Sequence, residues 1–87
     1  MKHSAGDEWL VCVRSGVTTN HRVRVTKQDL ERFAPGRSAE ELLKESFRFL
    51  LEREPNSSIL SAFDLPVIGR YFPEYERDIC TRLRQNR

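Results

Sequence analysis

The chain has no long apolar run and little net charge. No window approaches the roughly 20 consecutive apolar residues of a membrane-spanning helix, and the first residues lack the apolar stretch of a secretory signal. We therefore expect a cytoplasmic protein with no membrane partner. The formal net charge of +2 is too small for the field of the whole molecule to draw it onto nucleic acid.

Residues that carry chemistry are also scarce. Cys12, Cys80, His3 and His21 lack the paired spacing of a zinc site, and no glycine-rich phosphate-binding loop is present. The histidines are expected in a mobile N-terminus and at a strand edge, away from any nucleophile. We therefore expect no catalytic residue, no metal and no cofactor, and two reduced thiols because the cytosol opposes structural disulfides.

Two segments near the N-terminus alternate between apolar and polar residues. This period of two predicts two strands of an antiparallel hairpin, joined by a loop over residues 15–20 in which Gly16 and Asn20 supply positive φ. A lone hairpin leaves unpaired N–H and C=O groups on both edges, and a strand from a partner or a second copy would satisfy one of them. The apolar positions are Trp9, Val11, Val13, Val23 and Val25.

Helix-capping patterns follow the strands. Thr26 with Asp29, and Ser38 with Glu41, predict one short helix and then the longest helix of the chain, which ends near Arg53. The apolar positions of the longer helix cover about 200° of its circumference, so this helix is expected to pack on two sides.

The C-terminal third predicts short helices. One follows Pro55 and carries Ile59, Leu60 and Phe63, another is capped by Asp64, and the last begins after Pro73. The expected core residues are Trp9, Phe47, Leu50, Phe63, Ile68 and Phe72.

These elements predict an α+β fold, with an N-terminal antiparallel β-hairpin packed on a bundle of one long and several short α-helices. Residues 1–6 are expected to form a flexible tail, residues 7–83 a single domain, and residues 84–87 a frayed basic tail.

Arg14, Arg22 and Arg24 fall on one face of the predicted hairpin. Three arginines on one face are typical of a contact with phosphate or with an acidic protein surface. A solvated strand face is the favoured explanation of the three arginines, because arginine also discourages edge pairing. Residues 57–78 imitate a helix-turn-helix, but the second helix is mostly apolar and suits a core better than a DNA groove.

Five stretches between His21 and Ile79 carry a resemblance: HRVRVT, DLER, AEELLKESFRFLLEREP, SILSAFDLPVI and RYFPEYE. In this pattern the chain resembles a family of small uncharacterised bacterial proteins. The resemblance implies the fold boundaries and brings no activity, ligand or catalytic residue with it. The N-terminal strand departs most from the pattern, so residues 1–6 are expected to be a variable tail.

Together these features predict a non-enzymatic protein-interaction or adaptor module. It would bind a protein partner or a second copy through the hairpin edge, or through an exposed aromatic side chain such as Phe49 or Tyr75. The alternative is a nucleic-acid-binding regulator that uses Arg14, Arg22, Arg24 and the C-terminal arginines.

Overall fold

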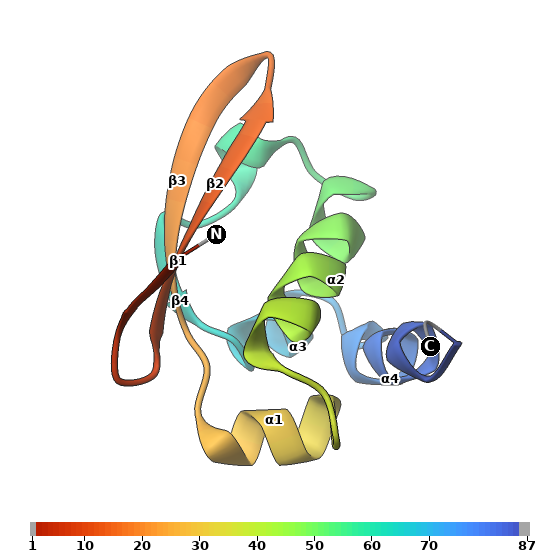
Figure 1. Cartoon of the computed structure of the whole chain (residues 1–87). Coiled ribbons are helices and arrows are strands. Elements are labelled where there is room, and N and C mark those ends of the chain that lie inside the picture. Colours follow the sequence, from red (N-terminus) through yellow and green to blue (C-terminus); the bar gives the residue numbers. More distant parts are fainter. Residues whose placement is uncertain (1, 86–87) are drawn as a thin grey trace.

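The predicted hairpin forms the centre of a four-stranded mixed sheet (Figure 1). The structure, a computed structural model, describes residues 2–85. Strands β2 (Glu8–Ser15) and β3 (Val17–Arg24) pair antiparallel along their full length, while β1 (Lys2–Ala5) pairs antiparallel with β2 and β4 (Ala62–Asp64) pairs parallel with β3. With four helices beside this sheet among the described residues, the predicted α+β class is confirmed.

Three predictions about the sheet are wrong. The sheet has four strands rather than two, because residues 2–5 pair with β2 instead of forming a flexible tail and residues 62–64 pair with β3. Residues 17–20 belong to β3, so the loop is a tight turn around Gly16, whose φ of +79° suits a residue without a side chain. Asn20 has no positive φ and lies inside the strand. Met1 lies outside the described residues.

Four helices follow, with α1 at Lys27–Phe33, α2 at Ala39–Leu51, α3 at Val67–Tyr71 and α4 at Tyr75–Gln85. Both predicted capping boxes are confirmed, since the Thr26 and Ser38 hydroxyls each accept from a backbone N–H three residues on. Arg84 belongs to α4 rather than to a frayed tail, and residues 86–87 of that predicted tail lie outside the described residues.

The segment between α2 and α3 differs from the prediction. A single 3₁₀ turn, η1 (Asn56–Ser58), precedes β4, so the predicted helix carrying Ile59, Leu60 and Phe63 is wrong. The physical reason is tertiary: Phe63 pairs with Val23 of β3 and packs against the core from the sheet. Asp64 ends β4 and does not cap α3, which begins after Pro66 without a side-chain cap.

Helix α2 lies between the sheet and α4 (Figure 1). On the sheet side, the Phe47 ring contacts the rings of His21 and Phe63. On the other side, the Phe49 ring meets the edges of Phe72 and Tyr75. The predicted packing of this helix on two sides is therefore confirmed.

The buried core differs in part from the six predicted residues. Phe47, Leu50 and Ile68 are buried, whereas Trp9, Phe63 and Phe72 are only partly buried. Phe49 and Tyr75, expected as exposed contacts for a partner, are fully buried, so that expectation is wrong. The largest fully buried side chains are Tyr75, Phe49, Leu42, Leu43, Leu65, Ile79, His21, Val23 and Ser46.

A buried pair of hydroxyls joins α2 to α4. The Ser46 hydroxyl bonds to the Leu42 carbonyl one turn earlier, at 2.6 Å. Because serine has a single proton to donate, the Tyr75 hydroxyl is the donor in its 2.6 Å bond to Ser46 Oγ. No buried side-chain polar atom among the described residues lacks a partner.

The burial of the Tyr75 hydroxyl makes the free energy of unfolding fall at alkaline pH. Burial raises the pKa of the Tyr75 hydroxyl above its ordinary value of 10, and the hydrogen bond to Ser46 opposes this with a smaller effect. Above about pH 10 the unfolded chain releases this proton and the folded chain keeps it, so the free energy of unfolding drops by about 1.4 kcal/mol per pH unit. Urea unfolding between about pH 8 and pH 11 measures the drop.

The Tyr75→Phe variant is the matched control for this drop, because its other titrating groups are unchanged. At neutral pH it is less stable by about 0.5–1.5 kcal/mol, and the difference shrinks as the pH rises above about 10. If the free energies of unfolding of the two proteins fell in parallel with rising pH, Tyr75 would not be the group that causes the drop.

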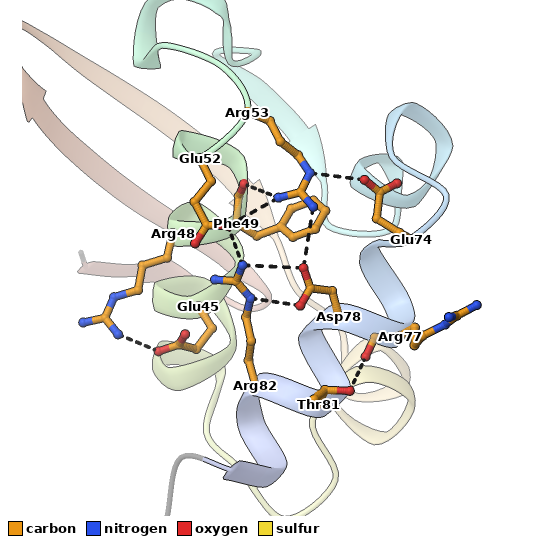
Figure 2. A network of polar contacts seen from close by, with 10 residues as sticks. All are labelled: Glu45, Arg48, Phe49, Glu52, Arg53, Glu74, Arg77, Asp78, Thr81 and Arg82. Carbon is orange, nitrogen blue, oxygen red and sulfur yellow. Dashed lines mark hydrogen bonds and ion pairs between the residues drawn. The ribbon is translucent and has the colours of Figure 1, made fainter.

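Ion pairs connect the polar faces of α2 and α4 above the Phe49 ring (Figure 2). Arg53 stacks 3.7 Å from the centroid of that ring and pairs with Glu74, while Arg82 pairs with Glu52 at 2.6 Å. The hydrogen bond from Arg82 holds the pKa of the Glu52 carboxyl below its usual 4.5. Glu52, the C-cap of α2, therefore contacts Arg82 of α4, while Arg48 pairs with Glu45 within α2 at 3.0 Å.

Candidate functional site

The three hairpin arginines lie on the outer face of the sheet and do not converge. Arg14 is opposite Thr18 near the turn, four residues along β3 from Arg22, which is about 13 Å at the rise of a strand. Carboxylates accompany the other two. The Arg22 Nε lies 3.6 Å from Glu8 Oε1, and in the strand register Arg24 lies opposite Glu8 of β2 and Asp64 of β4. A phosphate group would meet an electrically mixed surface here.

The edges of the hairpin are partly covered by the chain itself. β1 pairs with residues 8–10 of β2, and β4 pairs with residues 22–24 of β3, with the Arg22 N–H donating to the Ser61 carbonyl. Within the hairpin, residues 11–15 and 17–21 near the turn pair with no third strand among the described residues. A partner strand that binds the hairpin edge, as predicted, could therefore pair with only about half of β2 or of β3.

His21, which was predicted at a strand edge, has its side chain buried on the inner face of β3. Its Nδ1–H donates to the Leu60 carbonyl at 2.7 Å, because a carbonyl has no proton to give. Its Nε2 then accepts from the Thr19 hydroxyl at 2.8 Å. The alternation in the sequence contained this signal, since position 21 shares a face with Val23 and Val25.

An apolar groove opens between the segment that follows η1, the end of α2, and α3. It encloses about 290 Å³. Two of its large apolar side chains are unusually exposed, Leu60 at 45% and Tyr71 at 65%. The residues that line this apolar groove are Leu50, Glu54, Ser58, Ile59, Leu60, Phe63, Val67, Ile68, Tyr71 and Phe72.

Buried side chains and hydrogen bonds support the apolar groove from beneath. Leu50 and Ile68 are buried in the core, and the backbone of Leu60 is held by His21 from the central strand. Asn56 reinforces the same segment, because its buried side chain donates to the Val17 carbonyl at 2.8 Å. The groove is therefore held by hydrogen bonds to the sheet even though its segment has little regular structure.

Few polar groups face the apolar groove. Glu54 is the one charged residue that lines it, and within residues 2–85 its carboxylate makes no ion pair. Such a surface can hold apolar side chains and attract a cation at one end, but it offers no nucleophile and base in contact.

Other chemistry is sparse in the described part of the chain. No group of three or more histidine, cysteine or acidic side chains there is placed to hold a metal ion. Cys12 and Cys80 are both free thiols. Between residues 2 and 85, no helix has the length and apolar character to cross a membrane.

No protein-family model, no curated protein and no solved structure matches this chain. The resemblance to the small bacterial family therefore stays a prediction. Function must be inferred from the geometry of the surface itself.

Proposed function

We propose that this chain is a non-enzymatic protein-interaction module of the cytoplasm and that the apolar groove is its contact surface. The observation that carries the proposal is the exposure of Leu60 and Tyr71 beside a preformed apolar hollow. In this proposal the hairpin, packed on one longer helix and several short ones, is the scaffold that holds the groove in shape. This replaces the hairpin edge and the aromatic residues Phe49 and Tyr75 as the contact.

The occupant that fits is a peptide segment of a partner protein with apolar anchors and one basic residue. Burying an apolar side chain of the peptide is worth about 1.5–3 kcal/mol, and tyrosine is a residue that often dominates such contacts. The carboxylate of Glu54 lies at the rim without an ion pair among the described residues, so a lysine or arginine beside the anchors would complement it.

The nucleic-acid alternative draws less support from the surface. Glu8 and Asp64 offset Arg22 and Arg24, and Arg14 lies apart from both. Binding to phosphate would weaken steeply with added salt, whereas binding in an apolar groove would change little. Salt dependence therefore separates the two functions.

A displayed library of random peptides tests the proposal. The library is depleted on a variant with Leu60→Ser and Tyr71→Ala, and peptides are then selected on the wild-type protein. We expect selected peptides to carry apolar anchors beside lysine or arginine. Their affinity should fall at least about tenfold with Tyr71→Ala, because a central tyrosine contact is worth about 2 kcal/mol.

Val17→Ser is the matched control, since Val17 is also exposed but lies at the turn of the hairpin. Both sets of substitutions are at exposed positions, where folding changes little. Peptides that bind the wild-type protein and the depleted variant equally, or that lose affinity with Val17→Ser instead, would overturn the proposal. So would a surface that binds DNA or RNA with a steep salt dependence and enriches no peptide.

A further inference from the structure

A second groove lies at the other end of the helical layer, between α1, the loop before α2, and α4. It encloses about 420 Å³. Three of its lining residues are arginines and none is acidic. The residues that line this arginine groove are Arg32, Phe33, Ala34, Pro35, Arg37, Cys80, Leu83 and Arg84.

The three guanidinium groups come from α1, the loop before α2, and α4. They differ in the ion pairs that they make. Arg32 pairs with Glu76 at 2.7 Å. Arg37 pairs with Glu41 at 2.9 Å and also donates to the Leu83 carbonyl, which fixes it between the loop and α4. Arg84 is exposed and makes no ion pair with any described residue.

Within residues 2–85, this arrangement leaves about one positive charge without an ion pair. Two carboxylates outside the lining offset Arg32 and Arg37, and the charge of Arg84 remains. A guanidinium has five N–H donors in a planar fork, so even the paired arginines keep donors that can reach a ligand in the groove. The charge balance therefore favours a single carboxylate over a doubly charged phosphate.

The floor of the arginine groove is apolar. Phe33, Ala34 and Leu83 are buried and line it, and the Cys80 thiol reaches it from α4 with its Sγ 3.6 Å from the Phe33 carbonyl. A ligand that matches this lining has an apolar body on the floor and a carboxylate at the rim.

We propose that the arginine groove binds an organic monocarboxylate, with Arg84 as the group that pairs with the carboxylate. This site is separate from the apolar groove and does not depend on the function proposed for that groove. Cys80 supplies a built-in reporter, because a ligand on the floor covers its thiol.

Benzoate and benzamide test the proposal, because they have nearly the same shape and differ in charge. The native protein is alkylated with neutral iodoacetamide, in which the sulfur forms a bond to carbon and iodide leaves, and the two cysteines are followed separately by mass spectrometry. We expect saturating benzoate to slow alkylation of Cys80 several-fold and benzamide to have little effect. Cys12, which is exposed on the sheet, should react at the same rate throughout.

Arg84→Gln should raise the benzoate concentration needed for half-protection about two- to five-fold, the effect typical of one exposed ion pair. Arg77→Gln is the control, because Arg77 is exposed on the same helix and does not line the groove. Equal protection by benzamide would overturn the role of charge, and equal protection by inorganic phosphate would overturn the role of the apolar floor. Unchanged half-protection with Arg84→Gln would overturn the assignment of Arg84.

Discussion

Replacing Phe49 by alanine is expected to lower the free energy of unfolding by about 3–5 kcal/mol. The ring is fully buried, lies against the rings of Phe72 and Tyr75, and carries the guanidinium of Arg53 on its face. Truncation leaves a cavity between α2 and α4 and removes the cation–π contact that positions Arg53. A domain of this size has about 5–15 kcal/mol in total, so the loss is a large share.

Leu51→Ala is the control for this substitution. Leu51 lies on the same helix but is 39% exposed, so its truncation should cost well under half as much. Urea unfolding followed by circular dichroism measures both values. Equal losses for Phe49→Ala and Leu51→Ala would show that α2 does not bury Phe49 against α4.

Replacing His21 by leucine is expected to cost about 2–4 kcal/mol, because two hydrogen-bonding groups lose their partner at once. The Leu60 carbonyl and the Thr19 hydroxyl both face the imidazole, and the site is closed by the Phe47 ring. Leucine restores the apolar volume but accepts or donates nothing. The substitution should also loosen the wall of the apolar groove, so peptides selected on the wild-type protein should bind more weakly.

His3→Leu is the matched control, since His3 is the other histidine and is exposed on β1. It should change the free energy of unfolding by less than about 0.5 kcal/mol. Thermal unfolding of both variants supplies the comparison. A His21→Leu variant as stable as the wild-type protein would show that the hydrogen bond from His21 to the Leu60 carbonyl does not hold the segment that follows η1.

Local patterns predicted the elements whose stability is local. The capping boxes at Thr26 and Ser38 and the alternation that places Val11, Val13 and Val23 inside are confirmed by the structure. Each depends on residues within a few positions of one another. The two-sided packing of α2 also followed from the width of its own apolar arc.

The outer strands depend on partners far along the chain. Residues 62–64 become a strand because Phe63 meets Val23, and residues 2–5 because they meet β2. Alternation over three or four residues is too short to indicate either strand. Phe49 and Tyr75 were predicted to be exposed for a related reason. Only the position of α4 decides which side of α2 is covered, and α4 covers the side that carries Phe49.

The candidate site could be predicted less well than the fold. The apolar groove is formed by residues from the end of α2, the segment before β4, and α3, and no single stretch of sequence displays it. The hairpin arginines were visible in the sequence, but the neighbouring Glu8 and Asp64 were placed beside them only by strand register. Contacts across strands therefore decided which charges remained available.

The most direct test of the apolar groove is a methyl-labelled nuclear magnetic resonance titration with a selected peptide. We expect shift changes at Ile59, Leu60 and Val67, which line the groove. We expect none at Leu10 on the outer sheet surface or at Val17 beside the hairpin turn. Changes centred on Leu10 and Val17, with the groove methyl groups unmoved, would contradict the account.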